Sequence, residues 1–91
     1  MRYEWDEEKR KLNIAKHRVD FERVWKFDWS TALVTIDDRE DYGEVREIAV
    51  GFIEAILYVL GFTLRDEDIV RVITLRKASR AEAKRYAKAR R

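Results

Sequence analysis

The chain of 91 residues contains no cysteine and no proline, and it has only three glycines and one histidine. Without cysteine, disulfides and thiolate metal sites are impossible, and a single histidine excludes a histidine cluster that would bind zinc. The longest apolar run, residues 55–60, is far too short to cross a bilayer, and the N-terminus lacks the apolar centre of a signal peptide. The lack of proline argues against linkers, so we expect one cytoplasmic domain over residues 1–91, with no membrane contact.

Charge is distributed very unevenly along the chain. Residues 71–91 hold nine Lys or Arg side chains and one acid, whereas the first seventy residues hold eleven and seventeen. The C-terminal end therefore carries about +8 and the rest about −6, although the whole chain carries only +2. A one-sided cationic surface suits a polyanion such as RNA or DNA. An ordinary solvated basic helix would have the same composition.

The N-terminal third predicts two helices. Asp6 is a suitable N-cap for a helix over residues 7–16, in which Leu12 and Ala15 are expected to face inward. Asp20 begins a second, shorter helix.

From residue 32 onwards the apolar residues follow a period of two, which predicts strands. Short polar turns separate these strands, and turns of this length join antiparallel neighbours. The expected strands cover residues 32–36, 44–53, 55–65 and 69–75. Gly51 and Gly61 are isolated within strands and indicate bulges or points of close packing.

A capping box of Ser79 and Glu82 begins the last helix, which is expected to run from residue 80 to the end. Ala83, Tyr86 and Ala87 are expected to face the sheet. The order of two helices, four antiparallel strands and a C-terminal helix predicts an α+β domain.

His17 is the first candidate for chemistry, because it follows Lys16 at the end of the first predicted helix. The helix dipole would stabilise the protonated ring there, which suits proton transfer near neutral pH. A histidine at a helix end can equally serve only to cap free carbonyl groups.

The strand arginines form a second candidate group: Arg46, Arg65, Arg71 and Arg76. A guanidinium in a short strand gains no core packing, and several on one surface would bind phosphate through their planar forks. The alternation of side chains along a strand places Arg76 on the same face as Val72 and Thr74, and it places Arg71 on the opposite face. The alternative, for at least two of the four, is ion pairing with neighbouring acids.

Lys77, at the junction of the last strand and the last helix, could transfer a proton, and Tyr86 could donate a hydrogen bond to a phosphate oxygen. Tyr86 could also be only a half-buried anchor for its helix. The natural chemistry for such side chains is metal-free RNA cleavage. A ribose 2′-hydroxyl attacks its own phosphate, arginines stabilise the phosphoryl charge, and protein groups move protons.

Several short motifs, in this order, resemble the BrnT family of toxins from bacterial type II toxin–antitoxin systems. The matching pieces span nearly the whole chain: Trp5-Asp6, Lys9, Asn13, Lys16-His17, Phe21, Gly43 to Arg46, Gly51, Arg65, Arg71 to Ala78, Glu82 and Tyr86. The resemblance implies a compact RelE-like ribonuclease fold and toxicity through RNA cleavage. It also implies neutralisation by a BrnA-type antitoxin that binds operator DNA, the two proteins assembling into a larger complex.

Together, the candidate residues and this resemblance imply an endoribonuclease toxin that needs no metal or other cofactor, with RNA as its substrate and a BrnA-type antitoxin as its partner. In this hypothesis Arg65 and Arg76 hold the phosphate. His17 or Lys77 transfers protons.

Two further residues, Arg46 and Tyr86, would support or position the RNA. Additional RNA contacts are expected from basic side chains along the chain: Lys16, Arg71, Arg80 and Lys84. The alternative is a non-catalytic module that binds nucleic acid or a protein through the basic C-terminal helix. The oligomeric state stays open, including a dimer and a hetero-tetramer with the antitoxin.

Overall fold

The computed structural model describes residues 1–90. A five-stranded sheet forms its centre, in the order β1-β5-β4-β3-β2. The strands are β1 (Arg2–Glu4), β2 (Phe27–Asp37), β3 (Arg46–Ile53), β4 (Ile56–Asp66) and β5 (Ile69–Lys77). The helical elements are α1 (Glu7–His17), the 3₁₀ helix η1 (Phe21–Lys26) and α2 (Arg80–Ala89). The α+β class and the three helical segments are confirmed.

The sheet is mixed, so the prediction of four antiparallel strands is wrong. The short β1 pairs parallel with β5, whereas all other neighbours are antiparallel. Sequence periodicity could not reveal β1, because three residues are too few to show a period of two. β2 also begins at Phe27 rather than at residue 32, and an irregularity between Asp28 and Leu33 breaks its alternation.

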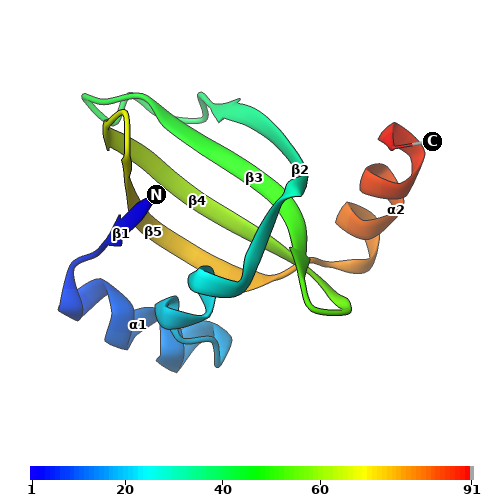
Figure 1. Ribbon diagram of the computed structural model, residues 1–91, viewed down its shortest axis with the longest axis horizontal. Coiled ribbons are helices and arrows are strands. Elements are labelled where there is room, and N and C mark those ends of the chain that lie inside the picture. The colour runs from blue at the N-terminus through cyan, green and yellow to red at the C-terminus, as the bar shows by residue number, and fades with distance from the viewer. Residues whose placement is uncertain (91) are drawn as a thin grey trace.

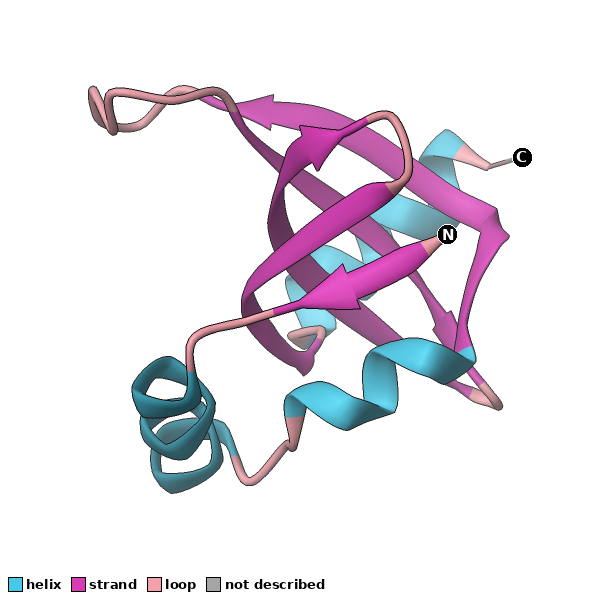
Figure 2. Ribbon diagram, turned by 60° about the vertical axis from the view of Figure 1, so that its left-hand side comes forward, coloured by secondary structure: helices cyan, strands magenta, loops and turns pink. Residues whose placement is uncertain are grey.

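Helices lie on both sides of the sheet. α1 and η1 lie together below it in Figure 1, and Figure 2 shows α2 behind the strands, on the side away from α1. The core fills the space between the sheet and the two N-terminal helical elements. Its fully buried side chains include Phe21 and Val24 from η1, and Ile53, Leu60 and Leu75 from the strands.

The buried residue of α1 is polar. Leu12 is 68% exposed and Ala15 is exposed, so the expectation that these two face inward is wrong. Asn13 is buried instead, and its amide nitrogen donates to the carbonyl oxygens of Val19 and Leu75 at 2.9 and 2.7 Å. Its amide oxygen accepts from the backbone N–H of Leu75 at 3.3 Å. One amide thus satisfies three buried backbone groups and ties α1 to β5.

α2 is attached to the domain by few contacts. The expected capping box is confirmed, since Ser79 and Glu82 bond to each other's backbone N–H groups. No residue of α2 is buried, and Ala87, which was expected to face the sheet, is exposed. Tyr86 is half-buried, and its hydroxyl donates to the carbonyl oxygen of Thr31. The helix ends at Ala89, and Arg91 lies outside the described residues.

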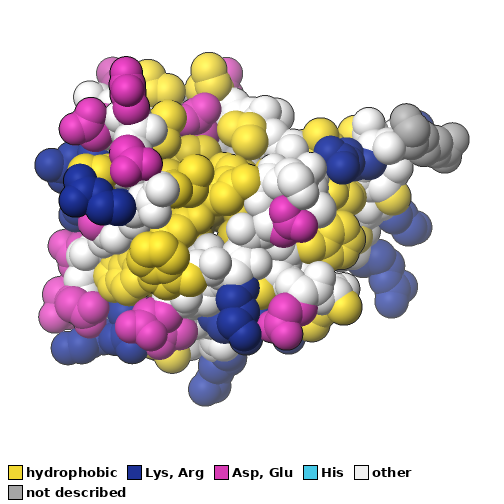
Figure 3. All heavy atoms as spheres, in the orientation of Figure 1, with side chains coloured by type: hydrophobic (Ala, Val, Ile, Leu, Met, Phe, Trp, Pro, Cys, Tyr) yellow, Lys and Arg dark blue, Asp and Glu magenta, His cyan; other side chains and the backbone are white. Residues whose placement is uncertain are grey.

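The surface separates apolar and charged side chains. Hydrophobic side chains gather in the middle of the face shown in Figure 3, with acidic side chains concentrated along its left edge. Exposed apolar side chains include those of Trp25, Val34, Ile36 and Leu64. Within residues 1–90, every helix is too short or too polar to span a membrane.

Candidate active site

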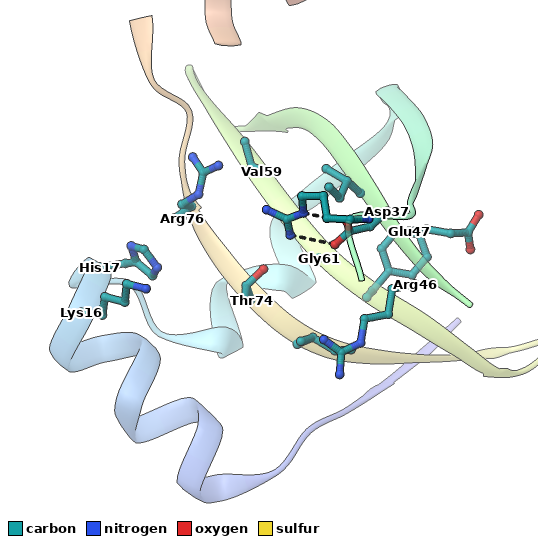
Figure 4. A pocket seen from close by; sticks show the side chains of 13 residues that line it. Lys16, His17, Asp37, Arg46, Glu47, Val59, Gly61, Thr74 and Arg76 are labelled. Atoms are coloured by element: carbon teal, nitrogen blue, oxygen red, sulfur yellow. Dashed lines mark hydrogen bonds and ion pairs between the residues drawn. The ribbon is translucent and has the colours of Figure 1, made fainter. Parts of the chain in front are cut away.

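The face of the sheet opposite the core carries a hollow. Cross-strand neighbours line it in two rows, the first Leu33, Val50, Val59 and Arg76, the second Thr35, Ile48, Gly61 and Thr74. Towards one end the hollow deepens into a cavity of about 260 Å³. We call it the cationic cavity, because its basic lining residues are Lys16, His17, Arg39, Arg46 and Arg76. Figure 4 shows His17 and Arg76 on one side of this cavity and Asp37 and Arg46 on the other.

A bulge in β5 brings the end of that strand to this face. The ladder between β4 and β5 skips Ile73, so Thr74 and Val72 pair with consecutive residues of β4. Because the bulge shifts the alternation, Val72 and Leu75 are both buried in the core, while Thr74 and Arg76 line the cavity. The predicted shared face is therefore correct for Thr74 and Arg76 and wrong for Val72.

Gly61 packs closely against Thr74 in the lining of the cavity. A Cβ atom at Gly61 would lie 2.5 Å from Oγ1 of Thr74, so the threonine hydroxyl fills the space that any other side chain would need. At Gly51 a Cβ atom would lie 2.9 Å from Cζ of Phe27. Close packing, one of the two predicted roles for these glycines, is confirmed at both positions.

Arg76 is held by α2. Its Nη1 and Nη2 atoms donate to the two carboxylate oxygens of Glu82, each at 2.7 Å. Glu82 also accepts from the backbone N–H of Ser79 at 2.8 Å, so one carboxylate caps the helix and orients the guanidinium. Hydrogen bonding from Arg76 lowers the pKa of Glu82 to about 2, and the pKa of Arg76 is raised in turn. The guanidinium is therefore fixed and always charged.

Arg39 is held in the same way by Asp37. Its Nε and Nη2 atoms donate to the two carboxylate oxygens at 2.7 and 2.8 Å. The Asp37 side chain is only 7% exposed, whereas the Arg39 side chain is 74% exposed. Hydrogen bonding from Arg39 lowers the pKa of Asp37 to about 2. The positive charge of Arg39 lowers the pKa of Arg76 and so offsets part of the rise caused by Glu82. The two guanidinium groups therefore interact electrostatically.

Sequence reasoning missed Arg39. The sequence predicts a polar turn between the strands expected at residues 32–36 and 44–53, and a charged side chain in such a turn needs no explanation. The only signal was its position two residues after Asp37, at the point where β2 ends.

His17 and Lys16 come from the last turn of α1. The helix ends at His17. The capping residue Arg18 adopts a left-handed conformation (φ 62°) and donates its backbone N–H to the carbonyl oxygen of Ile14. Burial lowers the pKa of His17 below its ordinary 6.5, and the charges of Lys16 and Arg76 lower it further. These effects act against the expected influence of the helix dipole, which would favour the protonated ring. A neutral imidazole next to two cations can accept a proton.

Arg46 forms the opposite wall of the cationic cavity. It pairs with Asp37 in the ladder between β2 and β3. Its guanidinium lies 4.0 Å from the ring centroid of Tyr42, and its Nε atom donates to Glu44 at 3.2 Å. Stacking and ion pairing therefore restrict this side chain as well.

Comparison with known proteins identifies the family. The family model described as "Ribonuclease toxin, BrnT, of type II toxin-antitoxin system" matches residues 5–82. The chain belongs to this family. It is also similar to the crystal structure of the Brucella abortus ribonuclease toxin BrnT, with a TM-score of 0.71 and 30% sequence identity over 88% of this chain and 99% of that chain. A search of curated proteins found no match. The resemblance inferred from short motifs is confirmed.

In this member of the BrnT family, two predicted arginines do not reach the cationic cavity. Arg65 and Arg71 both donate through Nη1 to one oxygen of Glu4 in β1, at 3.0 and 2.7 Å. Arg65 and Arg76 therefore do not lie together around one phosphate, as was predicted. The ion pairing considered as the alternative is present for all four strand arginines. Arg65 and Arg71 pair with Glu4. Arg46 pairs with Glu44, and Arg76 pairs with Glu82.

Three further predicted residues lie outside the cationic cavity. Lys77 is exposed next to Arg76, and Arg80 and Lys84 are exposed on α2. Tyr86 lines the adjoining part of the hollow together with Arg85, a residue that sequence reasoning did not select. Four of the predicted site residues do line the cationic cavity together: Lys16, His17, Arg46 and Arg76.

Proposed function

We propose that the cationic cavity is the active site of an endoribonuclease toxin that cleaves RNA without a metal ion. The observation that carries this proposal is the pairing of two oriented guanidinium groups, Arg39 and Arg76, with a histidine whose pKa is lowered. Charges fixed in advance stabilise developing negative charge without reorganisation during the reaction.

The proposed reaction starts with the ribose 2′-hydroxyl of the substrate. Neutral His17 takes its proton, and the oxygen attacks the adjacent phosphorus atom. Arg76 and Arg39 stabilise the negative charge on the phosphoryl oxygens, which is the role that planar guanidinium groups fill best. Lys16, a proton donor lining the same cavity, protonates the leaving 5′-oxygen. The products are a 2′,3′-cyclic phosphate and a free 5′-hydroxyl.

The metal-free character of the proposal rests on this same charge. The guanidinium groups supply the positive charge that a divalent cation supplies in two-metal nucleases. Among residues 1–90, His, Asp and Glu side chains form no group of three that could hold a metal ion.

Type II toxin–antitoxin membership implies an RNA substrate and an antitoxin partner. We propose that the partner is of the BrnA type, that it covers the cationic cavity, and that the two proteins form a hetero-tetramer in the cytoplasm. The order of helices followed by an antiparallel β2–β5 meander and a C-terminal helix also supports a RelE-like relationship.

The test of the proposed function is RNA cleavage by the purified protein in EDTA. We expect products ending in a 2′,3′-cyclic phosphate or 3′-phosphate, and a single 2′-deoxy substitution at the cleaved step should block the reaction. Cleavage that stops on chelation would contradict the metal-free mechanism. Binding that falls steeply with salt while the RNA stays intact would favour the non-catalytic module instead.

A further inference from the structure

The hollow continues beyond the cationic cavity into an apolar part. This part has a volume of about 360 Å³ and shares Arg39, Ile48, Val59 and Arg76 with the cationic cavity. Its remaining lining residues are Leu33, Thr35, Val50, Glu82, Arg85, Tyr86 and Ala89. We call it the apolar hollow. The proposed phosphoryl chemistry gives these aliphatic side chains no role.

We propose that the apolar hollow binds an unstacked nucleobase of single-stranded RNA, next to the phosphate that is cleaved. This inference rests on the proposed function. Bases in unpaired RNA are recognised on apolar and aromatic surfaces, because each base has a flat face that gains from leaving water. Arg39 and Arg76 border both parts, so a phosphate held by them places its attached nucleoside at the entrance of the apolar hollow.

The floor of the apolar hollow is suited to a flat ring. Leu33, Val50 and Val59 are consecutive cross-strand neighbours, so their side chains lie side by side on one face of three strands. Ile48 and Thr35 form the next row. Such a surface buries the flat face of a base but offers no hydrogen bonds to the base edge, so it does not distinguish one base from another.

Tyr86 provides an aromatic wall whose orientation is fixed. Its hydroxyl donates to the carbonyl oxygen of Thr31. Its ring packs edge-on against the Phe52 ring, with the ring centroids 5.7 Å apart and an angle of 84° between the ring planes. The ring therefore cannot rotate freely. Since α2 buries no residue of its own, the structure holds this helix in place mainly through Tyr86 and the Glu82–Arg76 pair. Forming one side of this hollow gives such a weakly packed helix a function.

The experiment compares adenosine 3′-monophosphate with inorganic phosphate, because only the nucleotide carries a base. We expect the wild-type protein to bind the nucleotide about tenfold more tightly than phosphate, because stacking of the base adds binding free energy. Ala89→Trp fills the apolar hollow from an exposed position of α2 and should abolish this advantage while leaving phosphate binding unchanged. Ala87→Trp is the matched control, since Ala87 is exposed on the same helix and does not line the hollow.

Circular dichroism and thermal unfolding establish that both tryptophan variants are folded. A nucleotide that binds no more tightly than phosphate, or an advantage that Ala89→Trp leaves intact, overturns the inference. Active protein without a nucleotide advantage refutes the subsite and leaves the ribonuclease standing. A nucleotide advantage that Ala89→Trp removes, in a protein that leaves RNA intact, supports the subsite and refutes the ribonuclease.

Discussion

The Glu82–Arg76 pair predicts a measurable, pH-dependent contribution to stability. Glu82→Gln removes the charge but keeps an oxygen that can accept from the Ser79 N–H, so the capping box survives. A pKa of about 2 in place of 4.5 corresponds to about 3 kcal/mol. The Arg76 and Glu82 side chains are 34% and 22% exposed, and screening by water reduces this to about 1–2 kcal/mol.

The sign of the pH dependence follows from the direction of the shift. Because folding lowers the pKa of Glu82, its contribution is complete above pH 4.5 and is lost as the pH falls towards 2. At pH 7 the variant should melt about 5–15 °C below the wild-type protein. The difference between the two should narrow steadily below pH 4.5.

The assay is thermal unfolding followed by circular dichroism from pH 7 downwards. Glu54→Gln is the matched control, because Glu54 pairs with Arg23 at 3.2 Å with side chains 62% and 41% exposed. We expect that control to lose less than about 0.5 kcal/mol. A double-mutant cycle with Arg76→Gln should return a coupling energy of about 1–2 kcal/mol. If Glu82→Gln loses no more stability than Glu54→Gln, the reasoning is refuted.

Three further predictions concern the floor and the support of the site. Asn13→Ala should lower the free energy of unfolding by about 2–4 kcal/mol in urea titrations, since three buried backbone groups, two of them on Leu75, lose their partner; an unchanged midpoint would contradict this role. Gly61→Ala should cost about 1–3 kcal/mol by overpacking, and adding Thr74→Ala should recover part of the loss. The value of kcat/KM for RNA cleavage should rise with pH through a midpoint below 6.5, where His17 loses its proton, and it should level off near neutrality. A midpoint above 6.5 would rule out this histidine as the base.

Much of the fold could be predicted because its signals are local. The four long strands follow a period of two over most of their length, and the capping box of Ser79 and Glu82 marks the start of α2. What the sequence could not show depends on contacts between distant segments. Asn13 is buried only because Val19 and Leu75 present backbone groups to it.

The candidate site shows the same division. Lys16, His17, Arg46 and Arg76 could be selected from residue type and predicted position. Arg65 could not be separated from them, because the acid that holds it, Glu4, lies in the strand that the sequence did not reveal.

Strand parity also failed near the site. The bulge at Ile73 reverses the alternation of side chains between the two faces of β5. No residue near Ile73 indicates a bulge in the sequence. Arg39 was missed because it lies just beyond the end of β2, where its pairing with Asp37 is visible only in three dimensions.

The most direct test of the cationic cavity compares kcat/KM for RNA cleavage in three arginine variants. Arg76→Ala and Arg39→Ala should each lose about 100-fold or more, the effect of removing one oriented donor from a transition state. Arg65→Ala should stay within a few-fold of the wild-type protein, because Arg65 binds Glu4 outside the cavity. Loss of activity in Arg65→Ala, with Arg39→Ala and Arg76→Ala fully active, would contradict the account.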